Sequence, residues 1–389
     1  KQLGSFSQST SRYQISLGTK KLFQHIKLLT KKGENNFPFI NNTKINNPIN
    51  IQKNNQLSQW GAQYELGYIV NDKNIIQATA LYFDSWRQIP PINGGVTNGE
   101  TQEDKLFRSF VSWKSYQDNF NSDLRVSFFN EKLNYIDTIS SIFSEVDVNT
   151  YQAQHRLKFK IFEAFDVETS IQNSFSEAFS TGFDESKTRN EAGAYVKISE
   201  DFKKGYYEVF ARQELIDKDL SPVVFGGGFV YNPFNNKLNF KGNISSNYRV
   251  PTLNDLYWAQ GGNQNLLPEN GWSAEVGIDL LKALKNYRCA VVTNNETVLS
   301  DKLSESRFNF GLIAFFNQTE NWIQWTPTEF GYWSPNNVKQ IENKGIELIT
   351  SFHHEKNDNK IDMRINYSFT HSRNKDFIDQ NQELADRIP

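Results

Sequence analysis

The sequence predicts an all-β chain that forms most of the wall of a transmembrane, antiparallel, up-and-down β-barrel. Three observations carry this prediction: a composition typical of strands, an alternation of apolar and polar side chains, and a regular exchange of short turns with long polar loops. The pattern yields roughly sixteen strands.

The composition favours strands and excludes several functional classes. Aromatic residues make up 14% of the 389 residues, charged residues 22%, and Cys and Met occur once each, a profile that suits strands better than helices. The net charge of −2 gives no electrostatic basis for binding nucleic acid. The single Cys289 cannot form an internal disulfide. No apolar run reaches the 18 or so residues of a membrane-spanning helix, but strands that alternate lipid-facing and lumen-facing side chains need none.

The alternation has a period of two, which places one set of side chains on each face of a strand. From Lys237 to Arg249, Leu, Phe, Gly, Ile, Ser and Tyr alternate with Lys, Asn, Lys, Asn, Ser, Asn and Arg. The same division recurs from Ile361 to Phe369 and around Phe308 to Phe316. Each segment therefore has one apolar face and one polar face.

The connections between strands alternate in length along the chain. Short turns are expected near residues 71–74, 117–119, 163–165, 203–205, 232–236 and 356–359. Long polar loops are expected at 34–55, 88–101, 132–150, 179–188, 216–223, 251–271 and 326–337. This rhythm is typical of transmembrane barrels, in which the outer loops are the long ones. Strands longer than the 9 to 11 residues that cross a bilayer suggest a wall that projects above the membrane. Residues 282–306 break the rhythm, because a long segment stands where a short turn is due.

Several phrases of the sequence resemble those of TonB-dependent outer-membrane receptors of the Bacteroidetes type, similar to receptors for siderophores and vitamin B12. The most specific phrases lie between residues 247 and 277, in the order NYRVPTLNDLYW, GNQNLLPE and EVG. The other matching phrases are Gly4–Phe6, Arg12–Gly18, Glu34–Phe39, Asn343–Leu348 and Arg387–Pro389. The sequence departs from the family in Gln264, where the family often has Pro, and in the 282–306 insertion.

The resemblance implies a location in the outer membrane of a Gram-negative cell and energised import. Residues 1–389 would be one partial barrel domain, an incomplete wall of roughly 16 of about 22 strands, that lacks the N-terminal plug and the last strands. In the family, a ligand binds the outer loops and the plug, and the TonB complex pulls on the plug. The implied partners are outer-membrane lipid, the TonB complex through the missing plug, and a small metal-chelate ligand.

The candidate ligand contacts lie in the outer loops, where aromatic and polar side chains gather. They are Arg87, Asp255, Tyr257, Trp258, Asn263, Asn265, Tyr332 and Trp333. Aromatic side chains at this height stack on rigid ligands. The alternative for the segment from Arg249 to Glu269 is structural, because Pro251 and Pro268 fix the backbone and tie the loop root to the rim. Trp86 and Trp322 also lie near outer loops and could contact a ligand. For these two residues the alternative is a place in the aromatic belt at the membrane surface.

Metal-binding and catalytic interpretations find little support. His353 and His354 are neighbours on a strand, so they point to opposite faces and cannot share an ion. Asp184, Glu185, Asp217 and Asp219 suit a Ca²⁺ site by type, although charged loop tips are the commoner explanation. The sequence has no nucleophile elbow, phosphate loop or metalloprotease motif. We therefore expect no catalytic residues, no metal site, no cofactor and no enzyme activity.

The leading functional hypothesis is TonB-energised uptake of a metal chelate, either a ferric siderophore or a cobalamin. A glycan importer with a surface lipoprotein partner is a variant of the same hypothesis. A passive porin or adhesin barrel is the second class, and an upstream plug of about 100 to 150 residues would separate it from a receptor. A soluble all-β binding module or glycan hydrolase is the third class, and it predicts a chain that stays in solution without detergent.

Overall fold

A computed structural model describes residues 2–91, 99–139, 141–162, 164–234, 237–284, 290–293, 296–299, 304–356 and 359–375. One large antiparallel sheet contains sixteen long strands, and each pairs with the next long strand along the chain. They are β2 (Ser9–Gly18), β3 (Leu22–Gly33), β6 (Leu57–Asn71), β7 (Asn74–Gln88), β8 (Thr101–Tyr116), β9 (Phe120–Asp137), β10 (Ile142–Ile161), β11 (Phe165–Ser180), β12 (Lys187–Phe202), β13 (Gly205–Ile216), β15 (Val224–Tyr231), β16 (Leu238–Arg249), β17 (Glu269–Leu284), β20 (Ser304–Pro327), β21 (Trp333–Lys356) and β22 (Asn359–Asn374). The predicted up-and-down architecture and strand number are confirmed.

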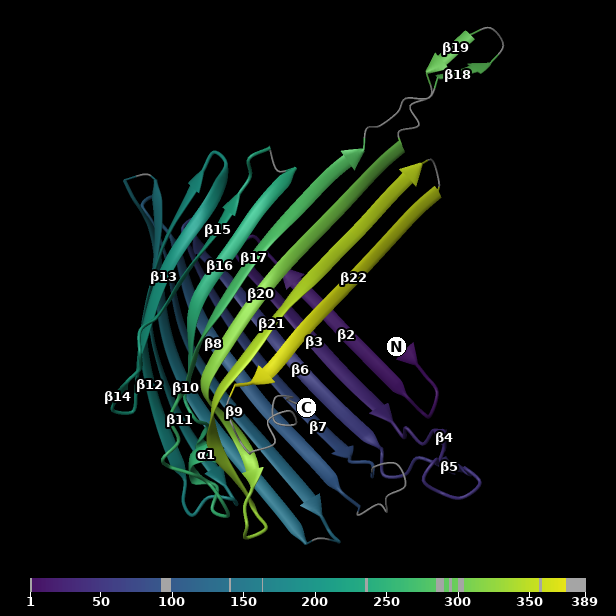
Figure 1. Ribbon diagram of the computed structural model, residues 1–389, viewed down its shortest axis with the longest axis vertical. Coiled ribbons are helices and arrows are strands. Elements are labelled where there is room, and N and C mark those ends of the chain that lie inside the picture. Colours follow the sequence, from purple (N-terminus) through teal and green to yellow (C-terminus); the bar gives the residue numbers. More distant parts are fainter. Residues whose placement is uncertain are drawn as a thin grey trace.

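The sheet curves into a barrel-like wall of tilted strands (Figure 1). Within the described residues, β22 pairs with β21, and β2 pairs with β3 and with the short strand β1 (Gln2–Leu3). No described ladder joins β22 to β2. No helix among the described residues is long and apolar enough to cross a membrane.

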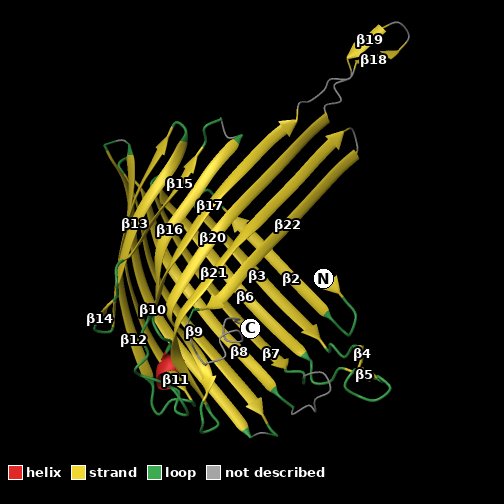
Figure 2. Cartoon of the chain, viewed as in Figure 1, coloured by secondary structure: helices red, strands yellow, loops and turns green. Residues whose placement is uncertain are grey.

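The two ends of the wall differ, as the loop rhythm predicted. The tight turns lie at one end, and at the other lie α1 (Leu253–Tyr257) and the hairpin of β4 (Pro38–Ile40) and β5 (Ile49–Ile51) (Figures 1 and 2). A two-residue strand, β14 (Asp219–Leu220), adds to β13 within another connection at this end. The 282–306 insertion carries a separate hairpin of β18 (Ala290–Thr293) and β19 (Glu296–Leu299), which extends beyond the turn end of the wall.

Strand register gives the wall an apolar outer face. Phe240, Ile278, Leu312, Leu348 and Tyr367 are direct neighbours across five successive strands and share one face. Most of these side chains are exposed rather than packed against a second layer. The wall is therefore one sheet thick, and its apolar face suits contact with lipid rather than a dry protein core.

The opposite face is polar and lines the lumen. On β16 and β17, Lys241 forms an ion pair with Asp279 at 2.9 Å, and Asn243 donates to Glu275 at 3.1 Å. The alternation predicted for residues 237–249 is thus realised as one lipid-facing and one lumen-facing set.

The outer face becomes polar towards the long-loop end. Next to the apolar Phe316 stands Lys344, and one step further Glu342 pairs with Lys344 at 3.3 Å and lies 3.6 Å from Arg373. Charged side chains on an outer face belong in water, so the upper part of the wall rises above the bilayer.

Two expected loops are shorter than the sequence suggested. Residues 132–150 were expected to be loop, yet β9 continues to Asp137 and β10 begins at Ile142. Similarly, β20 and β21 extend to Pro327 and Trp333, within the expected loop 326–337. Both expectations were wrong because the apolar outer face, by which strands were recognised, does not continue into these segments. In β9 and β10, for example, Lys132 and Asp147 lie opposite each other on the outer face.

Candidate ligand site at the long-loop rim

The connection between β16 and β17, here called the α1 loop (residues 250–268), begins with a capping box. The Thr252 hydroxyl accepts a hydrogen bond from the Asp255 backbone N–H at 3.1 Å. The Asp255 carboxylate in return accepts from the Thr252 backbone N–H at 2.9 Å and from its hydroxyl at 2.7 Å. This reciprocal arrangement satisfies the first donors of the short helix, so the sequence itself specifies the bend that follows Pro251.

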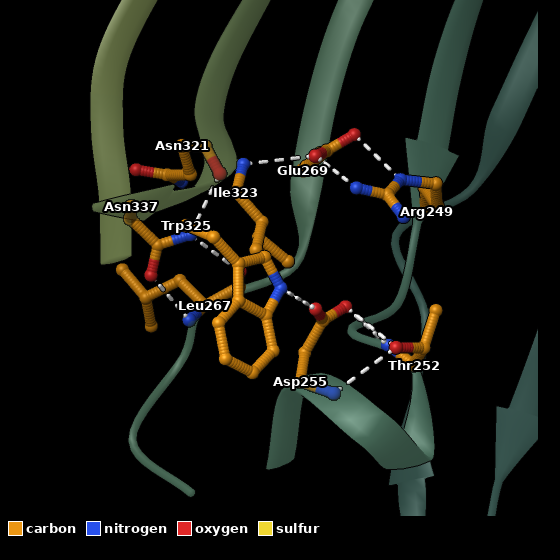
Figure 3. A network of polar contacts seen from close by, with 9 residues as sticks. All are labelled: Arg249, Thr252, Asp255, Leu267, Glu269, Asn321, Ile323, Trp325 and Asn337. Atoms are coloured by element: carbon orange, nitrogen blue, oxygen red, sulfur yellow. Dashed lines mark hydrogen bonds and ion pairs between the residues drawn. The ribbon is translucent and has the colours of Figure 1, made fainter. Parts of the chain in front are cut away.

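The second Asp255 oxygen ties the α1 loop to β20. Trp325 Nε1 donates to Asp255 Oδ1 at 2.9 Å, and the aspartate is only 7% exposed (Figure 3). Because both oxygens of this carboxylate accept hydrogen bonds from donors within the rim, Asp255 is positioned to hold the loop rather than to face solvent.

The root of the α1 loop is joined by an ion pair. Arg249 at the end of β16 donates to Glu269 at the start of β17, with Nε 2.7 Å from Oε2 and a second contact through Nη2. Glu269 also accepts from the backbone N–H of Ile323 at 2.9 Å (Figure 3). One carboxylate thus holds three neighbouring strands at a common height.

The distal half of the α1 loop lies along the β20–β21 hairpin. Asn337 accepts from the Leu267 N–H at 2.8 Å and donates to the Leu267 carbonyl at 2.9 Å. Asn263 donates to the Pro335 carbonyl at 3.2 Å, and the Ser334 hydroxyl donates to the Gly261 carbonyl at 2.8 Å. The loop is therefore anchored along its length.

A third anchor joins the α1 loop to the connection between β11 and β12. The Trp258 ring covers Gly182 so closely that a Cβ at Gly182 would lie 2.1 Å from the ring. Ala259 N–H donates to the Gly182 carbonyl at 2.7 Å. Lys187 Nζ lies 4.8 Å from the centroid of the Tyr257 ring, in cation–π geometry.

The tip of the β20–β21 hairpin presents aromatic side chains to solvent. Phe330 is 82% exposed, Tyr332 42% and Trp333 58%, and the Phe330 and Tyr332 rings stack with their centroids 6.2 Å apart. Thr328 fixes this turn, since its N–H and hydroxyl both donate to the Tyr332 carbonyl at 2.8 Å. Strand alternation places Trp333 on the same face as Trp325, which is the face that meets the α1 loop.

The structure brings seven of the eight predicted site residues into this one rim unit. Tyr332 and Trp333 are exposed on the hairpin. Asn265 donates its backbone N–H to the Asn263 side chain at 3.0 Å. The residues engaged in contacts within the rim are Asp255, Tyr257, Trp258 and Asn263.

Arg87 is separate from the other seven predicted residues. It lies on β7 and pairs with Asp104 of β8 at 2.8 Å. Nine long strands stand between β7 and β20 along the chain of pairings.

Sequence reasoning missed several residues that shape the rim. The candidate ligand contacts did not include Gly182, Trp325, Phe330 or Asn337. The capping box was readable as Thr252 followed three residues later by an acid. The contact with Trp325 spans 70 residues of sequence and leaves no local signal.

The histidine prediction is confirmed in its geometry. His353 Nδ1 lies 2.6 Å from Asp362, whereas His354 Nδ1 lies 2.7 Å from the Ser306 hydroxyl on the other face of the sheet. No group of three or more potential metal ligands occurs in the part of the chain that the structure describes. Of the loop acids, Asp217 accepts from the Asn190 N–H at 2.8 Å and Glu185 pairs with Lys187 at 2.9 Å.

Comparison with known sequences gives a family-wide match and two local ones. Residues 4–389 match the family model described as TonB dependent receptor-like, beta-barrel. A vitamin B12 transporter, BtuB, of Vibrio vulnificus is 32% identical over 114 residues, which cover 29% of this chain and 15% of that protein. The BtuB of Photobacterium profundum is 27% identical over 120 residues, or 30% of this chain and 16% of that protein.

Solved structures with the same fold are receptors and transporters by name. The FrpB iron transporter of Neisseria meningitidis superposes with a TM-score of 0.72 at 11% identity, covering 95% of this chain and 60% of that one. The siderophore receptor PirA of Pseudomonas aeruginosa gives 0.65 at 12% identity, with 95% and 66% covered. The copper transporter OprC gives 0.70 at 11% identity, with 96% and 62% covered. The chain therefore spans about two thirds or less of these relatives.

The curved antiparallel wall, its apolar outer face and the match over residues 4–389 agree with one another. The chain belongs to the TonB-dependent receptor β-barrel family of the outer membrane.

Proposed function

We propose that this wall belongs to a receptor that takes up a metal chelate, either a ferric siderophore or a cobalamin, with energy supplied by TonB acting on a plug domain. The observation that carries the proposal is the aromatic hairpin tip held on a braced α1 loop at the outer rim. The names of the relatives support the ligand class, since they include transporters of vitamin B12 and iron and a siderophore receptor.

The rim offers a rigid surface for a bulky ligand. Trp333 and Tyr332 are exposed while their backbone is fixed by Thr328 and the α1 loop. Aromatic rings gain contact area and stacking energy from flat or rigid ligands, and a surface that is already ordered loses little entropy on binding. We assign direct contact to Tyr332 and Trp333.

The other candidate residues have supporting parts in the proposal. Asp255 and Asn263 hold the α1 loop, while Tyr257, Trp258 and Asn265 shape its surface. Arg87, which keeps a partly exposed guanidinium beside Asp104, provides a charged contact on another part of the rim. The proposed role for the wall is binding and guidance, and the relatives are receptors and transporters rather than enzymes.

Binding measurements on the receptor that contains this chain test the proposal. Purified receptor is titrated with ferric enterobactin, ferrichrome and cyanocobalamin, using tryptophan fluorescence and calorimetry. We expect one of these probes to bind and Trp333→Ala to weaken it at least tenfold. Trp60→Ala is the matched control, because Trp60 is an exposed tryptophan on the outer face of β6 and does not belong to the β20–β21 hairpin.

Three outcomes contradict parts of the proposal. Failure to bind any of the metal chelates removes the ligand class, and binding of an oligosaccharide instead points to a glycan importer with a surface lipoprotein. Equal affinity of the Trp333→Ala and wild-type receptors removes the rim site. Uptake that continues in cells without TonB indicates a passive porin.

A further inference from the structure

A pocket on the lumen side of β10 to β13 lies outside the rim site. It has a volume of about 520 Å³ and is also lined by the end of β16, from Ser245 to Tyr248. The sheet is indented here because β15 is short: β13 pairs with it only as far as Arg212, and β16 only as far as Ser245. Ligand pockets commonly have volumes of about 300 to 1,000 Å³, so this one is large enough for a small molecule.

The pocket lies below the braced α1 loop. Arg249, at the root of that loop, directly follows Tyr248 of the pocket lining. On β12, Arg189 Nη2 donates to the Pro251 carbonyl at the start of the loop at 2.8 Å. Arg189 is nearer the long-loop end of β12 than Tyr195, which lines the pocket. These contacts place the pocket between the rim and the interior of the lumen.

Two arginines stand at the two sides of the pocket. Arg156, Ser170, Tyr195 and Arg212 are direct neighbours across four successive strands, and all of them line the pocket. Because neighbouring strands are about 4.8 Å apart, the backbones of the two arginines are separated by about 14 Å. Both side chains are partly exposed to the lumen. Their charge is permanent, since a guanidinium group does not lose its proton in proteins.

Each arginine has one carboxylate partner and keeps donors for a further acceptor. Arg156 Nε lies 3.4 Å from Glu168, and Arg212 Nη2 lies 3.5 Å from Glu214. A guanidinium group carries five N–H donors, so one long contact leaves most of them available. Paired N–H groups of this kind bind the oxygens of an anion in a bidentate manner.

The lumen face of the four strands that line the pocket has more cations than carboxylates. From the rim to the row of Ser199, strand register places on this face the cations Arg156, Lys158, Lys160, Lys187, Arg189, Lys197 and Arg212. The carboxylates on the same face are Asp166, Glu168, Glu191, Glu208 and Glu214. On the adjoining strand β9, Asp123 and Arg125 lie 3.8 Å apart and balance each other. Seven cations thus accompany five carboxylates on these strands, and such an excess attracts anionic ligands.

We propose that this pocket is a second subsite for the imported ligand, in which Arg156 and Arg212 bind the carboxylate or catecholate oxygens of an anionic ferric chelate. Tyr195 and Phe210 supply aromatic surface between the two arginines, which suits the rings of a catecholate. The inference rests on the function proposed above and narrows the ligand class, because it selects an anionic chelate over an uncharged one and over a cobalamin.

Binding and uptake measurements on the receptor that contains this chain test the subsite. The probes are the anionic ferric enterobactin and ferric citrate, with uncharged ferrichrome and cyanocobalamin for comparison. We expect an anionic chelate to bind best and the double variant Arg156→Gln/Arg212→Gln to weaken its binding at least tenfold. Arg156→Lys/Arg212→Lys, which keeps the charge, should restore part of the affinity. Arg108→Gln is the matched control, because Arg108 is a lumen-facing arginine of β8 that pairs with Glu131 outside the pocket.

The possible failures of the subsite and of the proposed function differ. Best binding of ferrichrome or cyanocobalamin rejects the subsite but leaves the uptake of a metal chelate intact. Equal affinity of the double glutamine variant and Arg108→Gln for the anionic chelate also rejects the subsite alone. A receptor that binds none of the four probes refutes the proposed function, and the subsite with it. Normal binding together with a lowered melting temperature of the double glutamine variant would assign the arginines to contact with the plug domain, and the subsite would be rejected.

Discussion

Asp255 shows how a single side chain organises the outer rim. Its two oxygens accept hydrogen bonds from the Thr252 backbone, the Thr252 hydroxyl and the Trp325 indole. The first two are local contacts that start a helix, while the third connects the α1 loop to β20. The sequence alone made this residue a ligand candidate, but its contacts assign it a positioning role in the proposed site.

Removing this carboxylate should loosen the α1 loop without unfolding the wall. Asp255→Ala leaves the Trp325 N–H and the Thr252 donors without their acceptor, at a cost of about 1 to 3 kcal/mol. Hydrogen–deuterium exchange should show faster exchange of amides in residues 252–268, with the β-strand amides unchanged. Glu329→Ala, at the exposed tip of the β20–β21 hairpin, is the control. Unchanged exchange in the α1 loop of the Asp255→Ala receptor would refute the anchoring role.

The α1 loop is also an element held from two sides. Asn337 and Ser334 fix it to the β20–β21 hairpin, and Gly182 receives the Trp258 ring from the opposite side. Because the same loop contacts both Gly182 and the β20–β21 hairpin, we expect a displacement of the loop at Gly182 to change the position of the aromatic hairpin tip.

Gly182→Ala tests this connection between elements. The new Cβ would fall 2.1 Å from the Trp258 ring, so the ring and the loop that carries it must shift, at a cost of about 1 to 3 kcal/mol. We expect weaker binding of whichever chelate the wild-type receptor binds, although residue 182 does not contact the exposed aromatic tip. Gly228→Ala is the control, since its Cβ would meet its nearest neighbour at an ordinary 3.4 Å. Equal affinities in the two variants would disprove the coupling.

Sequence reasoning succeeded where one physical constraint acts along a single strand. Lipid on one side and water on the other impose the alternation of residues 237–249, so strand identity and face were both predictable. Above the bilayer the constraint disappears, and residues 132–137 and 142–150 were mistaken for loop although they pair in β9 and β10. The rim contacts were unpredictable for a different reason. Trp325 meets Asp255 because β20 pairs with β17, and a contact between residues 70 positions apart is encoded by no local pattern.

The whole molecule derives its orientation from the distribution of side chains on its outer face. Within the described residues, an apolar belt crosses every long strand from β2 to β22, and the charged side chains of Glu342 and Arg373 lie above it on the last two strands. The belt fixes the depth of the protein in the bilayer, and the long-loop end then faces the exterior, as is usual for outer-membrane barrels. The rim and the apolar belt therefore belong to different environments of one continuous sheet.

Substitutions at two adjacent residues of β16 distinguish the lipid-facing side of the wall from the lumen-facing side. Ile244 is 53% exposed on the outer face within the apolar belt, so Ile244→Lys places a charge in hydrocarbon and should cost about 2 to 4 kcal/mol near the bilayer midplane. Asn243 faces the lumen and donates to Glu275, so Asn243→Lys gains an acidic partner in a polar setting and should be nearly neutral. The free energy of unfolding, measured by urea titration of the receptor in lipid vesicles, should fall in the first variant alone. Because one residue shifts a side chain from one face to the other, the reverse order of stabilities would mean that the lipid and lumen faces are exchanged.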